Sequence, residues 1–86
     1  MADRAFIDRQ RVIRHAMLAE LYAKRQSARV GHGGYCRDLT HALGHDPQEC
    51  EFALGYLVEA GWIHRESIHC RITALGMERY EQEVCR

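Results

Sequence analysis

Residues 46–61 read DPQECEFALGYLVEAG, and this segment carries the clearest helix signal in the chain. Asp46 is a favourable N-cap, Pro47 suits the first helical position, and Glu49 falls where a capping box places an acid. Gly61 suits the position just past the end of a helix. The segment therefore predicts a helix whose apolar stripe is formed by Cys50, Ala53, Leu54, Leu57 and Val58.

A β-hairpin is predicted directly after this helix. Residues 62–65 and 68–72 are rich in apolar and β-branched side chains and would be its two strands, joined by a two-residue turn. That turn would lack the glycine that such turns prefer, so a wider loop is the alternative. The pairs expected with the short turn are Ile63 with Cys70, His64 with His69 and Trp62 with Arg71.

Three further helices are predicted around this unit. The first begins at Asp8 as its N-cap, and a glycine-rich loop over residues 27–34 and a short strand near Tyr35 follow it. A short helix over residues 36–43 comes next, and Thr73 caps a last helix after the hairpin. The side chains expected to face the core on these helices are Val12, Ile13, Ala16, Met17, Leu21, Tyr22, Leu39, Ala42, Leu43, Leu75, Met77, Tyr80 and Val84.

Length and composition limit the chain to one small domain, residues 1–86. The 86 residues hold 12 basic and 12 acidic side chains and are 47% apolar, which argues against disorder and excludes a large two-lobed enzyme. A chain of this size buries a thin core, so a partner subunit would stabilise it. Neither a bilayer-spanning run nor a signal-peptide pattern is found in the sequence, and we therefore expect a cytoplasmic protein without membrane contact.

The four cysteines are expected to be reduced. They stand at positions 36, 50, 70 and 85, and no CxxC pair occurs. In a reducing cytoplasm such residues act as small buried hydrophobic side chains, and Cys50 and Cys70 are expected in the core.

Two segments, LVEAGWI at residues 57–63 and ITALG at residues 72–76, resemble the winged helix-turn-helix family of small bacterial transcriptional regulators. In that family a recognition helix ends on leucine, polar residues, a glycine and an apolar pair. A β-hairpin wing and a short Thr-x-x-Gly motif then lead into the last helix. The resemblance covers residues 35–80 and implies an α+β fold with a three-helix core, a two-stranded wing and a C-terminal helix.

The resemblance also implies binding to double-stranded DNA, with the helix that begins at Pro47 in the major groove. Residues 1–37 carry eight basic and three acidic side chains, whereas residues 38–86 carry four and nine, so a polyanion would be attracted mainly to the first half. We expect a cytoplasmic transcriptional regulator that forms a homodimer through its first and last helices. The expected DNA-contacting residues are Arg37, Gln48, Arg65 and Arg71, with Arg11 and Arg14 as additional phosphate contacts.

Two other functions stay open. The helix after Asp46 has several acids and no Lys or Arg, so Phe52, Tyr56 and Glu51 would instead bind a protein partner. Phe52 is nevertheless expected in the core, because exposed Phe is uncommon. His64 and His69 facing each other would suit a metal- or redox-responsive regulator, but no cluster supplies four ligands, and scattered histidines are the favoured interpretation. The sequence has no nucleophile motif, phosphate loop or HExxH, so neither enzymatic activity nor a cofactor or metal site is expected.

Overall fold

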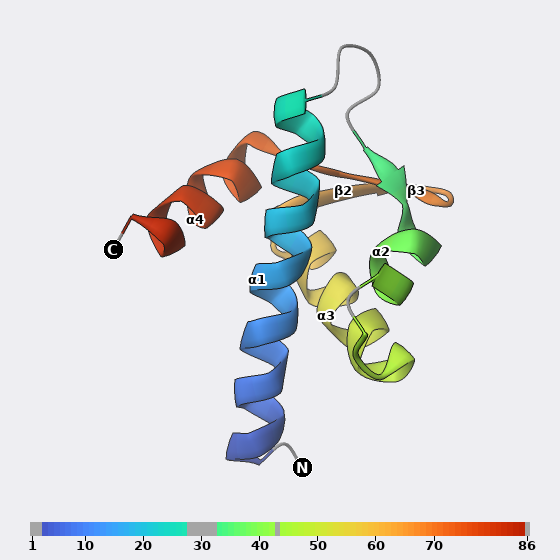
Figure 1. Cartoon of the computed structure of the whole chain (residues 1–86), viewed down its shortest axis with the longest axis vertical. Coiled ribbons are helices and arrows are strands. Elements are labelled where there is room, and N and C mark those ends of the chain that lie inside the picture. The colour runs from blue at the N-terminus through green and yellow to red at the C-terminus, as the bar shows by residue number, and fades with distance from the viewer. Residues whose placement is uncertain (1–2, 28–32, 43, 86) are drawn as a thin grey trace.

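The computed structural model describes residues 3–27, 33–42 and 44–85, which form an α+β fold with four helices and one three-stranded antiparallel sheet. The strand order is β1-β3-β2, so the first strand lies beside the last. Figure 1 shows α4 on one side of α1, with α2 and α3 on the other. The elements are α1 (Arg4–Ser27), β1 (Gly34–Tyr35), α2 (Cys36–Ala42), α3 (Pro47–Glu59), β2 (Ile63–Glu66), β3 (His69–Ile72) and α4 (Ala74–Val84). Among the described residues, no helix is both long and apolar enough to cross a membrane.

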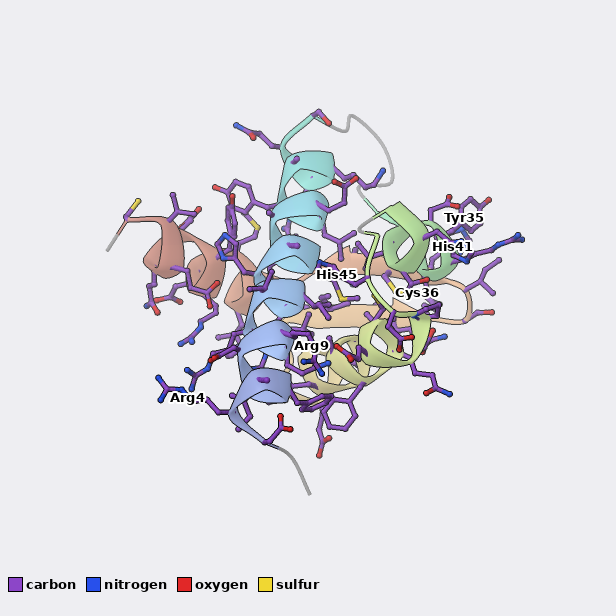
Figure 2. The ribbon with its side chains drawn as sticks, turned by 60° about the horizontal axis from the view of Figure 1, so that its bottom comes forward. Arg4, Arg9, Tyr35, Cys36, His41 and His45 are labelled. Carbon is purple, nitrogen blue, oxygen red and sulfur yellow. A yellow bond between two sulfur atoms is a disulfide. The ribbon has the colours of Figure 1, made fainter. Side chains whose placement is uncertain are left out.

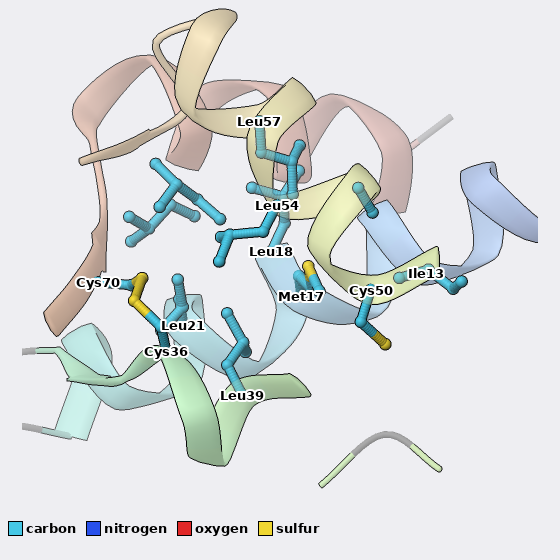
Figure 3. Packing of buried hydrophobic residues seen from close by; sticks show 13 residues of the cluster. Ile13, Met17, Leu18, Leu21, Cys36, Leu39, Cys50, Leu54, Leu57 and Cys70 are labelled. Carbon is cyan, nitrogen blue, oxygen red and sulfur yellow. A yellow bond between two sulfur atoms is a disulfide. The ribbon is translucent and has the colours of Figure 1, made fainter. Parts of the chain in front are cut away.

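The core lies where α1, α3 and the hairpin meet, and Figure 3 shows its side chains. The apolar stripe predicted for α3 is confirmed, with Val58 at its half-buried edge. On α1 the 3.6-residue spacing correctly identified Ile13, Met17 and Leu21, but Val12 is exposed. The fully buried side chains are Ile13, Met17, Leu18, Leu21, Cys50, Ala53, Leu54, Leu57, Ile63, Cys70 and Ile72.

The start of α1 was placed one turn too late. Asp3, rather than Asp8, caps this helix, because its Oδ1 accepts a hydrogen bond from the Phe6 amide at 2.8 Å. The additional turn brings the Phe6 ring against Phe52 of α3, with the ring centroids 5.3 Å apart. This tertiary contact extends the helix toward the N-terminus.

The predicted cap of α3 is confirmed. Asp46 Oδ2 accepts hydrogen bonds from the amides of Gln48 and Glu49, both at 3.1 Å. The Glu49 carboxylate does not complete a capping box but accepts two hydrogen bonds from Arg9 on α1. Gly61 follows the helix with a φ of 83°, as expected for its end.

The hairpin has a different register from the one predicted. Its turn is formed by Ser67 and Ile68, and Ile63 therefore pairs with Ile72, while His64 faces Arg71 rather than His69. The shift moves each partner by two residues, so every side chain keeps its face and the apolar pattern is unchanged. Three features explain the observed register. Ser67 in the turn has a φ of 56°, and the buried Ile63 and Ile72 lie opposite each other. The Cys36 amide also donates a hydrogen bond to the Ile68 carbonyl at 2.8 Å.

Thr73 caps α4 as predicted and also ties the helix to the preceding turn. Its Oγ1 accepts from the Gly76 amide at 3.0 Å and donates to the Gly61 carbonyl at 2.6 Å. Gly76 is buried, and a Cβ at this position would overlap the carbonyl oxygen of Trp62. Met77 and Tyr80 pack on the core as expected, but the predictions for Leu75 and Val84 were wrong, because both are exposed.

The expectation of four reduced, buried cysteines was wrong for three of them. Cys36 and Cys70 form a buried disulfide with their Cα atoms 5.6 Å apart, because β1 brings the start of α2 beside β3. Cys50 is a free, buried thiol as expected, whereas Cys85 is exposed. The predicted inward position of Leu43 and most of the glycine-rich loop lie outside the described residues.

Candidate functional site

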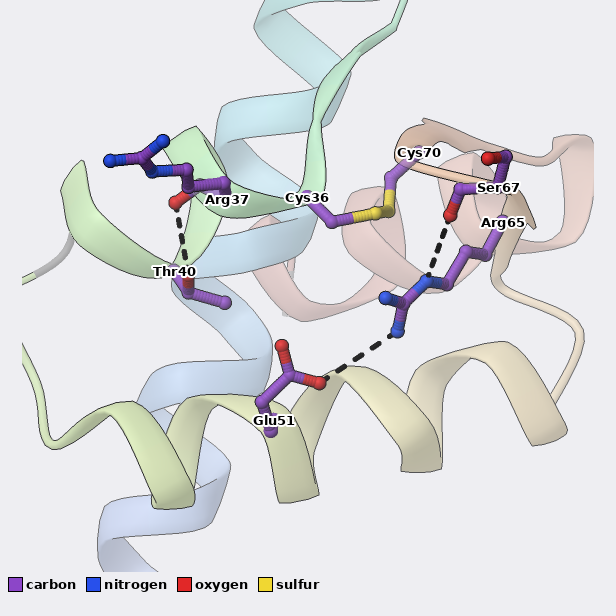
Figure 4. The surroundings of a disulfide bond; sticks show 7 residues. All are labelled: Cys36, Arg37, Thr40, Glu51, Arg65, Ser67 and Cys70. Carbon is purple, nitrogen blue, oxygen red and sulfur yellow. Dashed lines mark hydrogen bonds and ion pairs between the residues drawn. A yellow bond between two sulfur atoms is a disulfide. The ribbon is translucent and has the colours of Figure 1, made fainter.

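Arg37 and Arg65, which are far apart in the sequence, line the same hollow. This hollow has a volume of about 740 Å³ and lies between the start of α2, the first turns of α3 and the tip of the hairpin. Figure 4 shows Arg65 directed toward Glu51 of α3, while Arg37 lies on the other side of the disulfide with its guanidinium pointing away from Arg65. Two of the predicted phosphate contacts therefore lie at opposite edges of one hollow beside the helix predicted to read DNA.

Arg65 bridges the hairpin tip and α3. Its Nη1 lies 3.7 Å from Oε2 of Glu51, and its Nε donates a hydrogen bond to the Ser67 carbonyl at 3.4 Å. Both side chains of the ion pair are substantially exposed, so solvent screens their attraction and the pair can open at low cost.

Arg37 lies in the first turn of α2 and is exposed. Its carbonyl accepts a hydrogen bond from the Thr40 hydroxyl at 2.9 Å, while its guanidinium has no ion-pair partner among the described residues. Figure 2 shows Tyr35 and His41 on the same part of the molecule. Arg37 is thus a free cation at the edge of the hollow.

Gln48 is exposed on the first turn of α3, and the acids near it have partners. Asp46 is occupied as the helix cap, and Glu49 binds the Arg9 guanidinium through two contacts of 3.0 and 3.2 Å. Figure 2 shows Arg9 between α1 and α3. The hydrogen bond and the charge of Glu49 raise the pKa of Arg9, and the Gln10 amide donates to the Glu49 carbonyl at 2.9 Å. The first turn of α3 therefore exposes less uncompensated negative charge than its sequence suggests.

The other predicted DNA contacts lie elsewhere. Arg71 lines a second hollow, on the other face of the hairpin, together with Lys24 and His64. Arg11 and Arg14 line a third, between α1 and α4, where the Arg14 guanidinium lies 4.1 Å from the centroid of the Tyr56 ring. The six predicted residues thus divide between three hollows and the exposed start of α3, and only Arg37 and Arg65 share a hollow beside the first turns of α3.

The aromatic residues of α3 are exposed, and the expectation of a core position for Phe52 was wrong. Phe52 is 61% exposed, and its ring contacts Phe6 edge-on. Tyr56 is 44% exposed and contacts Trp62 with the ring centroids 6.0 Å apart. Both residues lie on the side of α3 that faces α1, whereas Glu51 faces the hairpin tip.

A shared metal between His64 and His69 is not supported by the observed register. His64 faces Arg71 and lies 3.9 Å from the Glu66 carboxylate, while His69 faces Glu66 and its ring stacks on Tyr35. In the part of the chain that the structure describes, no group of three or more His, Cys, Asp or Glu residues could hold a metal.

The sequence analysis missed Arg79 and the contacts of Trp62. The Arg79 guanidinium, not that of Arg71, lies over the Trp62 ring, 5.0 Å from its centroid. Arg79 also contacts Glu83 four residues further along α4, at 3.0 Å. This i,i+4 spacing is the signal that would have identified Arg79 as a structured side chain.

Comparisons of the chain with protein-family models, curated proteins and solved structures find no match. A function for the chain is therefore inferred from its geometry alone.

Proposed function

We propose that the chain is a winged helix domain that binds double-stranded DNA and regulates transcription. The element order supports this proposal: a helix, a short strand, two helices separated by four residues, and a hairpin whose second strand, β3, also pairs with β1. The observation that carries it is that Arg37 and Arg65 line opposite edges of one hollow beside the first turns of α3.

In the proposed complex α3 lies in the major groove, with the hairpin as the wing beside it. Gln48 on the first turn of α3 would reach a base edge, because its amide can pair with adenine through two hydrogen bonds. Arg37 and Arg65 would bind backbone phosphates on either side, and Arg71 would reach a phosphate from the outer face of the wing. Arg11 and Arg14 line the hollow between α1 and α4 and do not line the hollow of Arg37. We therefore assign them no part in the proposed contact with DNA.

The acidic side chains of α3 would repel DNA phosphates, and their ion pairs weaken this repulsion. Glu49 is held by Arg9, and Glu51 lies beside Arg65. A carboxylate with a cationic partner repels a phosphate less than a free one does. Binding would still depend mainly on electrostatics and weaken steeply with salt.

A homodimer through α1 and α4 is part of the proposal. Within one chain these helices already contact each other, because the Tyr22 hydroxyl donates to Glu81 at 2.6 Å and His15 bonds Glu83 at 2.8 Å. The exposed apolar side chains left on them for a second copy are Ile7, Val12, Leu75 and Val84. Sedimentation velocity over a range of concentrations tests this, since a single monomer boundary throughout would contradict it.

DNA binding is tested by a gel-shift assay with a pool of genomic fragments at low and moderate salt. We expect a shift at low salt that weakens as salt rises, and about a tenfold loss of affinity for Arg37→Ala and for Arg65→Ala. The matched control is Arg4→Ala, which removes the same charge from the first turn of α1, where Figure 2 shows the side chain turned away from α2. No shift at low salt, or equal losses in all three variants, would contradict the proposal.

The exposure of Phe52 and Tyr56 favours a second candidate function, binding of a protein partner through the α1-facing side of α3 and Glu51. Large exposed aromatic side chains are typical anchors of protein interfaces. A pull-down that compares the wild type with Phe52→Ala/Tyr56→Ala discriminates between the two functions. This candidate predicts that the double variant loses a specific partner that the wild type retains. If every bound protein is retained equally by both proteins, the candidate is excluded.

A further inference from the structure

The cavity between α1, the C-terminal part of α3 and α4 is separate from the proposed DNA-binding face. Its volume is about 530 Å³, within the range of pockets that bind small molecules. Three arginines from two helices line it, namely Arg11, Arg14 and Arg79. Such a concentration of guanidinium groups in one concave site is the arrangement that proteins use to bind oxyanions.

The only acid that lines this cavity is already neutralised. Glu83 accepts hydrogen bonds from Arg79 at 3.0 Å and from His15 at 2.8 Å. Burial alone would raise the pKa of Glu83, but the bonds from His15 and Arg79 outweigh it and hold the pKa below its ordinary value, so the carboxylate stays ionised. Without counting His15, the three arginines and one carboxylate give the lining two net positive charges.

Two of the guanidinium groups have no anionic partner. In the part of the chain that the structure describes, Arg11 and Arg14 form no ion pair. Arg14 lies over the Tyr56 ring at 4.1 Å, and this contact limits the movement of its planar group. The N–H groups at the edge of a stacked guanidinium remain free to donate. The guanidinium groups of Arg11 and Arg14 therefore supply the cavity with positively charged hydrogen-bond donors that have no anionic acceptor among the described residues.

Two aromatic rings also line the cavity. Trp62 is half-buried, Tyr56 is 44% exposed, and both line the cavity. Rings in such a position favour a ligand with a flat apolar body. A phosphate monoester carries about −1.5 to −2 charges at pH 7 and three acceptor oxygens, which matches the two uncompensated charges and the free arginine donors.

We propose that this cavity binds a small phosphate monoester attached to a flat ring, a ligand of the size and chemistry of a mononucleotide. The phosphate would lie between Arg11 and Arg14, with the ring against Trp62 and Tyr56. The proposal does not depend on DNA binding, because the arginines of this cavity are different from Arg37 and Arg65.

Trp62 is the only tryptophan of the chain, so its fluorescence reports on this cavity. The probe is phenyl phosphate, titrated at constant ionic strength. We expect a saturable change in Trp62 emission and at least tenfold weaker binding to Arg14→Gln. Arg11 is exposed, so Arg11→Gln provides a second test in a variant that keeps the fold, and we expect a loss of similar size. Lys24→Gln is the matched control, since it removes the same charge elsewhere on α1 and leaves phenyl phosphate binding unchanged.

Other probes identify the ligand class. Inorganic phosphate is expected to bind at least tenfold more weakly than phenyl phosphate. Equal binding of the two would contradict the proposal that the cavity recognises a flat ring. If benzoate binds as tightly as phenyl phosphate, the cavity does not require a phosphate group, and the site is assigned to carboxylates. The proposal as a whole fails if no probe gives a saturable change, or if Lys24→Gln weakens binding as much as Arg11→Gln. It also fails if the probes do not bind while Arg11→Gln weakens binding to duplex DNA, because Arg11 would then be a DNA phosphate contact.

Discussion

Arg65 at the hairpin tip and Glu51 on α3 form an ion pair, 3.7 Å between Nη1 and Oε2, across the surface proposed to meet DNA. The pair is exposed, so its own contribution to stability is small. The pair matters for DNA binding because Arg65 attracts a phosphate, whereas Glu51 repels it.

Replacing Glu51 is therefore expected to strengthen DNA binding. Glu51→Gln removes the repulsion and frees Arg65, so affinity at low salt should rise about three- to tenfold, and the gain should shrink as salt screens it. Fluorescence anisotropy of a labelled duplex at several salt concentrations measures the effect. Glu78→Gln on the exposed side of α4 is the control, and an equal gain in that variant would mean that only net charge matters.

The disulfide between Cys36 and Cys70 is expected to contribute strongly to stability. The two residues are 34 positions apart, and closing a loop of that length stabilises the fold by about 3–4 kcal/mol. Urea unfolding of Cys36→Ser/Cys70→Ser should show this loss, and reduction of the wild type should reproduce it. Cys85→Ser, at an exposed free thiol, should stay within about 0.5 kcal/mol of the wild type, and a double variant as stable as the oxidised protein would exclude the bond.

Two glycines are expected to respond to alanine with opposite signs. A Cβ at Gly76 would overlap the Trp62 carbonyl, so Gly76→Ala should cost at least about 2 kcal/mol. A Cβ at Gly55, inside α3, would meet nothing within 4 Å, so Gly55→Ala should stabilise the fold by about 0.5–1 kcal/mol through its helix propensity. Thermal and urea unfolding measure both changes, and a harmless Gly76→Ala would show that α4 does not pack closely on the turn.

Acid is expected to remove the contribution of Glu83. Its pKa in the folded protein lies below the ordinary value of 4.5, because hydrogen bonds from His15 and Arg79 outweigh the effect of burial. A carboxyl group with a lowered folded pKa stabilises the protein above the unfolded pKa and loses this contribution as the pH falls through the folded pKa. The difference in unfolding free energy between the wild type and Glu83→Gln should thus decline in buffer more acidic than about pH 5. A difference that does not depend on pH would contradict the ion pair.

The elements that depend on local chemistry were predictable from the sequence. Asp46 and Thr73 cap their helices through amides two or three residues away, and such contacts need nothing from the rest of the fold. The start of α1 was not predictable in this way, because Asp3 and Asp8 are both good caps and the choice depends on Phe6 meeting Phe52.

The hairpin register and the disulfide depend on tertiary structure. A shift of two residues leaves Ile63 and Cys70 facing inward, so the apolar pattern could not distinguish the two registers. The Cys36–Cys70 pair forms because β1 adds to β3, a long-range contact that spacing does not reveal.

The same limit applies to the candidate site. Side-chain chemistry identified Arg37 and Arg65 as phosphate-binding candidates, but only the packing of α2 against α3 and the hairpin shows that they share a hollow. Trp62 and Arg79 were missed because their contact joins the end of α3 to α4.

The two ends of α1 are attached to different parts of the molecule. Gln10 bonds the Glu49 carbonyl at the start of α3, and Arg25 donates to the Ile72 carbonyl at the end of β3, at 3.0 Å. Fifteen helical residues separate these attachments, a span of about 22 Å. The helix α1 thereby fixes the distance between α3 and the hairpin and their relative orientation. One inserted residue between Gln10 and Arg25 would rotate its ends by about 100° relative to each other, and the two attachments could no longer be made together.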